Sequence, residues 1–210
     1  FELKLGENFL RTWQPCFLHP QKIPDLPMDR VAMDVLTIGP SAHGYNSILT
    51  VVDYLTRFVW AYPIKNERTE TILRLLRFQL FPHMGLPKAI LSDRGANFTS
   101  ELTAKMMDIY GVRQLFTAPL HPKADGLAER ENGVILEVLA KKTYQHHADW
   151  VDVLPDVLMA LNSSPQTSTK RSAFQAMYGR HPNLPSNSIF AKQASLYVWA
   201  MDDWITRLPH

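Results

Sequence analysis

The chain has 210 residues, of which 46% are apolar, and a formal net charge of +2. This size and content favour one ordinary domain with arms at its ends, and the weak positive charge permits a nucleic-acid partner without arguing for one. The single cysteine, Cys16, excludes a disulfide framework and a zinc knuckle built from several cysteines. No apolar run approaches the roughly 18 residues of a membrane span, so we expect no membrane partner. The chain begins at Phe1 and not at a methionine, so we expect a fragment of a longer protein. It shows no signal-peptide pattern and has one cysteine, so we expect a protein from a reducing compartment.

Five strands are predicted after an irregular, proline-rich stretch at 1–29. Runs of β-branched and aromatic residues predict the first three strands at 30–38, 48–53 and 58–64. Short loops join these three, so they should pair antiparallel, whereas the later strands, before Asp93 and at 112–116, follow helices and should be parallel. The prediction is an α/β fold with a five-stranded mixed sheet and helices on both faces.

Helical periodicity of apolar residues predicts helices at 69–81, 100–110, about 126–143, 150–161, 172–178 and 194–208. Thr69 is a candidate N-cap for the first helix, and Pro82 is expected to end it. Thr99 or Ser100 should cap the second helix, with Gly111 closing it.

Three carboxylates stand out against this scaffold. Asp34 lies inside an apolar run at 31–36, where a buried carboxylate is costly without a partner. Asp93 follows a short apolar strand, although an aspartate beginning a turn explains it equally well. Glu129 follows Asp93 with 35 residues between them, near the start of a predicted helix.

Taken alone, Glu129 is better explained as a solvated acid favoured by the helix dipole. Helical geometry places it roughly 140–180° away from the apolar Leu127, Val134 and Val138, off the main packing face.

If these three acids converge, they cannot all stay ionised unaided. Two like charges about 4 Å apart repel by roughly 4 kcal/mol at an effective dielectric near 20. Divalent cations between them relieve the repulsion, and a site built only from oxygen ligands selects Mg²⁺ or Mn²⁺. Two such ions can clamp the attacking and leaving oxygens of a phosphoryl transfer.

The sequence resembles the catalytic core of retroviral and gypsy-type retrotransposon integrases over roughly residues 30–185. The spacing of Asp93 and Glu129 matches the hallmark of that family. The other matching segments are 33–36, 39–40, 48–57 (ILTVVDYLTR), 85–95, 98–100, 121–126 (HPKADG), 129–130 with Asn132, 162–164, Thr167, 172–174 and 178–180.

The resemblance implies a ribonuclease H-like fold and a metal-dependent DNA strand transferase and endonuclease. It implies that Asp34 bridges two metal ions, Mg²⁺ or Mn²⁺, while Asp93 holds one and Glu129 the other. Expected partners are the DNA ends of the element, target DNA, and further copies of the chain in a dimer or larger multimer. The expected location is the nucleus, or a virus-like particle or the cytoplasm before nuclear entry.

Further residues have both a functional and a structural explanation. His121, Lys123 and Asp125 are candidates for contact with DNA ends, or they simply belong to a loop shaped by prolines. Candidates for phosphate contact are basic residues that are more commonly just solvated: Arg130, Lys141, Lys142, Lys170 and Arg171. Asp53 is interpreted as a polar residue at a strand end and not a ligand. His146 and His147 are interpreted as an exposed helix end.

Departures from the family pattern leave a second hypothesis open. Integrases of this type carry an upstream zinc module ending in Cys-x-x-Cys, but here Cys16 stands alone and Trp13 takes its partner's place. Gly133 stands where relatives have a basic residue, and Glu131 where an apolar one is usual, so phosphate contact should weaken.

The expected division is therefore an arm at 1–29 with a remnant of the zinc module, a catalytic core at 30–180 and an extension at 181–210. The alternative function is a domesticated, integrase-derived module that binds DNA or protein with little or no catalysis. A third candidate function is that of a nuclease of the same fold that acts on RNA–DNA hybrids.

Overall fold

A five-stranded sheet forms the centre of the molecule in the computed structural model, which describes residues 23–117, 126–146, 148–166 and 170–184. The strand order is β3-β2-β1-β4-β5. The strands are β1 (Val31–Thr37), β2 (Ser47–Asp53), β3 (Val59–Ile64), β4 (Ala89–Ser92) and β5 (Arg113–Phe116). The first three strands pair antiparallel, and β4 and β5 join them in parallel, which confirms the predicted mixed sheet.

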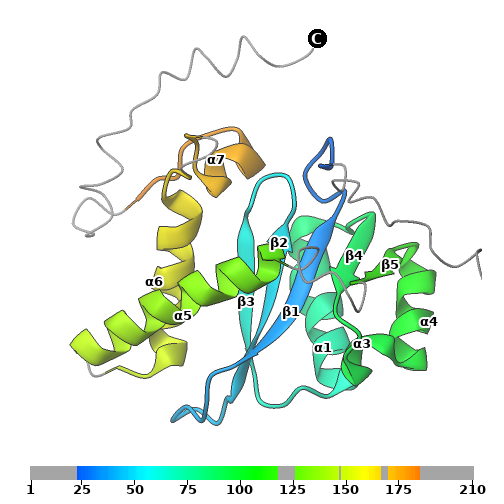
Figure 1. Cartoon of the computed structure of the whole chain (residues 1–210), viewed down its shortest axis with the longest axis horizontal. Helices are drawn as coiled ribbons and strands as arrows, with labels where there is room; N and C mark the ends of the chain where they lie inside the picture. Colours follow the sequence, from blue (N-terminus) through cyan, green and yellow to red (C-terminus); the bar gives the residue numbers. More distant parts are fainter. Residues whose placement is uncertain (1–22, 118–125, 147, 167–169, 185–210) are drawn as a thin grey trace, which may run out of the picture.

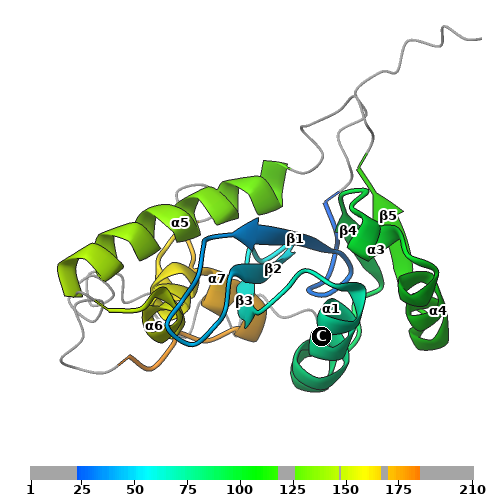
Figure 2. The same cartoon turned by 90° about the horizontal axis from the view of Figure 1, so that it is seen from below.

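Helices cover both faces of this sheet. Figure 2 shows α5 along one face, with α1 and α4 on the other. Figure 1 places α6 and α7 beside the β3 edge of the sheet. The helical elements are α1 (Thr69–Leu75), a π-helical turn η1 (Leu76–Leu80), α2 (Phe81–Met84), α3 (Ala96–Thr99), α4 (Glu101–Tyr110), α5 (Gly126–His146), α6 (Trp150–Ser163) and α7 (Ala173–Tyr178).

The strand β2 is buried along its whole length because it supplies side chains to a core on each face. Leu49 and Val51 pack into the cluster with α1, η1 and α4. Ile48 and Val52 pack into the second cluster with α5 and α6. Apolar residues on both sides are therefore needed here, which explains why β2 reads as a continuous hydrophobic run.

Pro82 does not end the first helix as predicted, because the chain remains helical until Gly85, whose φ is 79°. Proline lacks an N–H and clashes with the carbonyl four residues before it. The π-helical turn directly before it shifts the hydrogen bonding by one residue, and Phe81 donates its N–H to Leu76. The wider turn lets the chain accommodate Pro82 and continue for three more residues.

The other predicted helix ends differ in detail. Thr69 is the first helical residue and not the cap, which is Arg68, and the short helix α3 was not predicted. Ser100 caps α4 by accepting a hydrogen bond from the Thr103 N–H, and Gly111 closes α4 in the left-handed conformation, both as expected. The helix predicted at 194–208 lies outside the described residues. No helix in the described part is long and apolar enough to cross a membrane.

Candidate active site

Asp34 lies in the middle of β1, the central strand, with its side chain on the face covered by α5. It is half-buried, and Leu36, two residues on and therefore on the same face, packs against the cluster formed with α5 and α6. The Asp34 Oδ2 accepts a hydrogen bond of 2.7 Å from Nδ2 of Asn132 on α5. The carboxylate at the centre of the sheet is thus oriented by the helix above it.

Asp93 directly follows β4, the parallel neighbour of β1. Val31 pairs with Ile90 and Ala32 with Leu91, so continuing this register by two residues brings Asp34 level with Asp93. Neighbouring strands lie about 4.8 Å apart, so the two aspartates occupy adjacent positions. The sheet topology therefore brings together two acids separated by 59 positions in the sequence.

The turn after Asp93 holds its carboxylate close to the backbone. The Gly95 N–H donates a 2.9 Å hydrogen bond to Asp93 Oδ1. A β-carbon on Gly95 would lie 3.0 Å from that oxygen and 2.6 Å from Asn97 Oδ1, closer than normal contact allows. A side chain at position 95 would therefore displace Asn97 and press on the Asp93 carboxylate, so glycine suits this turn.

Asn132 lies on the buried face of α5, together with Ala128, Ile135 and Leu139. Its side chain is 5% exposed, and its Oδ1 has no hydrogen-bond partner among the described residues. Its resemblance to the family segment was noted in the sequence, but its contact with Asp34 was not predicted. Its spacing, one helical turn after Glu129, is a signal that could have identified it.

Position 129 borders this buried face, which revises the sequence-based interpretation. Val134 and Val138 are only partly buried, and the face centres instead on the residues around Asn132. Helical geometry places position 129 about 60° from Asn132. The side chain of Glu129 is outside the described part, and no cluster of three potential metal ligands occurs among the described residues. Whether all three acids converge stays a prediction.

Carboxylate oxygens on adjacent strands are the donors that a hard divalent cation prefers. Asn132 orients Asp34 by a hydrogen bond, as residues that contact the ligands do in metal sites. Gly95 has no side chain and leaves room for the carboxylate of Asp93. The Oδ1 of Asn132, which has no hydrogen-bond partner in the described part of the chain, adds a buried polar atom beside Asp34. The residues present therefore fit such a cation.

Comparison with known proteins identifies the family of this chain. Residues 24–122 match the family model "Integrase core domain". The chain is 36% identical over 171 residues to the Pro-Pol polyprotein of Simian foamy virus type 3 (strain LK3), covering 81% of this chain and 15% of that protein. This chain carries an integrase core domain of the retroviral type.

Solved structures agree on the fold of this integrase core. A chain of the simian T-cell lymphotropic virus intasome in complex with PP2A regulatory subunit B56 gamma superposes with a TM-score of 0.69 at 21% identity, covering 80% of this chain and 61% of that one. The HTLV-2 integrase catalytic core domain in complex with magnesium (trimeric form) gives 0.61 at 23% identity, covering 73% and 98%. The fold is the ribonuclease H-like fold that the sequence predicted.

Asp53 has a structural role in the integrase core, as predicted. It is 0% exposed, and its carboxylate accepts hydrogen bonds from the N–H groups of Met28 and Thr56 and from the Thr56 hydroxyl. These three bonds satisfy the buried charge and fix the turn between β2 and β3. The arrangement leaves Asp53 as a turn anchor and not a ligand.

The predicted DNA contacts of the integrase core are mostly untested. His121, Lys123, Asp125 and His147, with the side chain of His146, lie outside the described residues. Arg130 is exposed on α5, while Lys141 pairs with Glu137 at 2.5 Å and Lys142 is half-buried. Beyond α6, Lys170 is exposed and Arg171 is half-buried.

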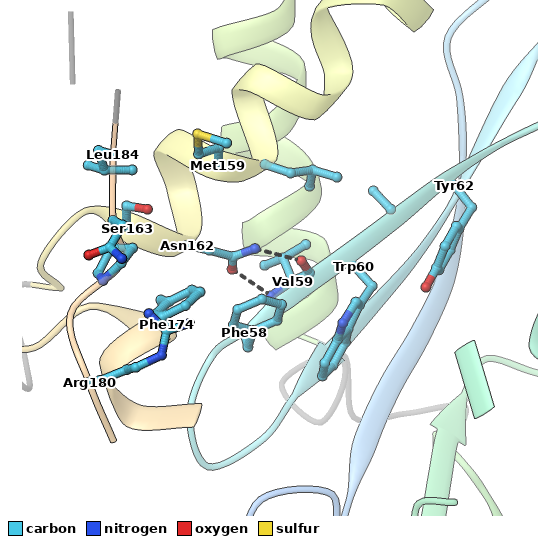
Figure 3. A pocket seen from close by; sticks show the side chains of 14 residues that line it. Phe58, Val59, Trp60, Tyr62, Met159, Asn162, Ser163, Phe174, Arg180 and Leu184 are labelled. Carbon is cyan, nitrogen blue, oxygen red and sulfur yellow. Dashed lines mark hydrogen bonds between the residues drawn. The ribbon is translucent and has the colours of Figure 1, made fainter. Parts of the chain in front are cut away.

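A cavity of about 490 Å³ lies between β3, α6, α7 and residues 180–184 of the integrase core. Figure 3 shows its aromatic wall, with Phe58, Trp60 and Phe174, and the amide of Asn162 turned toward β3. Asn162 accepts a 2.8 Å bond from the Val59 N–H and donates another of 2.8 Å to the Val59 carbonyl. The cavity lining contains no carboxylate, histidine or cysteine, so it lacks the chemistry of the aspartate pair.

Proposed function

We propose that this integrase core is a DNA strand transferase and endonuclease that nicks DNA 3′ ends and joins them to target DNA. The observation that carries the proposal is the adjacency of Asp34 and Asp93, with α5 fastened to Asp34 through Asn132. The chain spans about 15% of the length of the polyprotein it matches, so the activity of the whole protein is part of the proposal.

In this proposal Asp34, Asp93 and Glu129 hold Mg²⁺ or Mn²⁺, which would polarise the scissile phosphate and activate a water or a DNA 3′-hydroxyl. The chain itself supplies position and charge. Asn132 fixes the Asp34 carboxylate, the turn at Gly95 fixes that of Asp93, and α5 carries Glu129 on the turn preceding Asn132. No covalent intermediate with the protein is needed, because both nucleophiles are oxygens of water or DNA.

The partners and boundaries follow from the same proposal. Residues 30–180 would form the catalytic core, flanked by the arm at 1–29 and the extension at 181–210. DNA ends, target DNA and further copies of the chain would be the partners, with nuclear action following assembly in a particle or the cytoplasm.

The test is a nicking and joining assay on labelled DNA ends in Mg²⁺ or Mn²⁺. Asp34→Asn, Asp93→Asn and Glu129→Gln should each abolish both reactions. Asp156→Asn, an exposed residue on α6, is the matched control and should retain activity. Activity that survives the triple substitution would refute the proposal, and a preference for RNA–DNA hybrids would identify the related nuclease instead.

The second candidate, an integrase-derived binding module with little catalysis, rests on the lone Cys16 of the zinc-module remnant and on Gly133, with Glu131 as a further departure on the same helix. Gly133 is exposed on α5 and carries no side chain for a phosphate contact. Calorimetric titration of Mn²⁺ into the wild type and Asp34→Asn separates the two candidates. A binding event that depends on Asp34 supports catalysis, and its absence supports the module.

A further inference from the structure

A second groove, of about 580 Å³, opens where β3 ends and α1 begins. Three aromatic side chains, those of Tyr45, Tyr62 and Phe78, share its lining with two cations, Lys65 and Arg74. It is distinct from the aspartate pair because Tyr62 packs against the core on the α1 face, whereas Asp34 faces α5. The groove therefore lies where β3 ends, with Tyr62 on the α1 side and Tyr45 against the cluster of α5 and α6, and it contains neither aspartate.

The charge of this groove is wholly positive. Its lining contains no aspartate or glutamate, and neither Lys65 nor Arg74 forms a salt bridge with any residue of the described part. Glu67, the nearby acid, accepts hydrogen bonds from the hydroxyls of Thr37 and Ser47, and no ion pair joins Glu70 to Arg74 one turn later. The two cations are therefore available for an anionic ligand.

The aromatic side chains are placed to stack. Phe78 is 57% exposed at the rim, and the guanidinium of Arg77 lies 5.2 Å from its ring centroid. The ammonium of Lys65 lies 5.6 Å from the ring centroid of Tyr45. Burial raises the pKa of Tyr62 to about 12, so its phenol keeps its proton at neutral pH and no phenolate opposes an anion. Rings and cations thus alternate along one open surface.

The groove lies at the end of the sheet where β1 and β3 finish, and the aspartate pair lies further back along β1. The strand β3 runs in the same direction as β1, since both are antiparallel to β2, and Thr37 at the end of β1 donates its hydroxyl to Glu67 beside the groove. Asp34 precedes Thr37 by three residues, a span of about 10 Å along a strand.

We propose that this groove binds single-stranded nucleic acid, with backbone phosphates on Lys65 and Arg74 and bases stacked on Phe78 and Tyr45. Positively charged surfaces interleaved with exposed aromatic rings are the usual means of binding single strands without reading their sequence. An apolar peptide would leave both cations uncompensated, and a duplex would offer no free base faces for stacking. The binding needs no metal and no contribution from the aspartate pair.

The test is fluorescence anisotropy of a labelled 20-nucleotide single strand with the full 210-residue chain in EDTA, over a series of salt concentrations. Phe78→Ala should weaken binding about 10-fold, within the range for loss of one stacked base. Arg74→Glu should weaken it and reduce the slope of log affinity against log salt by about 0.7 or more, since a phosphate contact is lost.

Matched controls exist on α4. Ile109→Ala removes a side chain that is 81% exposed, and Lys105→Glu reverses a charge that is 67% exposed, both away from the groove. These two control variants should bind like the wild type. Urea unfolding should show that both controls, and also Phe78→Ala and Arg74→Glu, remain folded. Equal losses in the control variants, or no loss in Phe78→Ala and Arg74→Glu, would overturn the proposal.

Two further outcomes keep this proposal separate from that of the active site. Single-strand binding should persist in Asp34→Asn, whatever that change does to nicking. If Arg74→Glu instead changes the oligomeric state in size-exclusion chromatography and leaves the affinity unchanged, the groove is a protein interface and the proposal fails.

Discussion

The carboxylate of Asp34 is oriented by Asn132, which lies 98 residues further along the chain. The sequence identified Asp34 because a carboxylate inside an apolar strand needs a partner. It did not identify the partner, because the buried face of α5 includes a polar residue among Ala128, Ile135 and Leu139. Apolar periodicity alone cannot assign an asparagine to a packed face.

Replacing Asn132 with alanine should impair catalysis while the fold is kept. The Asp34 carboxylate would lose its 2.7 Å hydrogen bond, and losses of outer ligands of this kind typically lower metal affinity or activity 10–100-fold. Calorimetric Mn²⁺ affinity and the nicking rate both measure the effect. Leu136→Ala on the same helix, 38% exposed, is the control, and equal losses in both variants would show a general effect on α5.

Two glycines near the site should respond in opposite ways to alanine. In Gly95→Ala the new β-carbon would lie 2.6 Å from Asn97 Oδ1 and 3.0 Å from Asp93 Oδ1, so the Asn97 side chain must move and the Asp93 carboxylate must shift by a few tenths of an ångström, which should lower the nicking rate. Gly133→Ala meets no atom within 4 Å and should stabilise α5 by about 0.5–1 kcal/mol. Urea unfolding and the nicking assay measure both. Normal activity in Gly95→Ala would contradict the role assigned to that turn.

At the scale of elements, the strands were predictable because each is a run of β-branched or aromatic residues between turn residues. The helix through Pro82 was not, since a π-helical turn depends on how Leu76 and Leu80 pack beneath it, which the sequence does not display. The helix α3 was missed because four residues are too few to show a period. The capping residues Ser100 and Gly111 were identified correctly because their roles are local.

The contact between α6 and β3 depends on Asn162, whose side chain satisfies both backbone groups of Val59. Asn162→Ala would leave a buried N–H and a buried carbonyl unpaired, at a cost of about 2–4 kcal/mol. The free energy of unfolding in urea measures this cost. Ser163→Ala, the next residue on α6, should change it little, and a comparable loss there would mean that the α6 terminus is generally sensitive.

Glu131 on α5 should make stability fall as pH rises. Burial raises the pKa of Glu131 above its usual 4.5, although the positive charges of Arg57 and Arg130 partly oppose this. Between the unfolded and folded pKa values the native state binds more protons, so the free energy of unfolding decreases with increasing pH. Glu131→Gln should therefore be more stable than the wild type at pH 8 and equal to it well below pH 4.5. If the two proteins differed in free energy of unfolding by the same amount at both pH values, the effect would not come from titration of Glu131.

At the scale of the whole molecule, sheet topology explains why residues distant in the sequence form one site. The order of short loops followed by helical crossovers predicted a mixed sheet, but it did not predict which strand β4 joins. β1 and β3 run in the same direction, so a parallel β4 fits beside either one, and only the structure places it next to β1 and brings the aspartates to adjacent strands. The position of the Glu129 side chain was not predictable either, since it depends on how the start of α5 sits over the sheet.

The outer edge of β3, where Asn162 hydrogen-bonds the backbone of Val59, also limits how copies of this domain can associate. Val59 has both of its outward backbone groups engaged by Asn162, and Pro63, four residues on, has no N–H to offer. A strand from another molecule would find few partners here, so this edge of the sheet is protected against edge-to-edge pairing and the aggregation that follows from it. Any assembly across this side must be built from side chains, and its specificity can then change by surface substitution without disturbing the backbone.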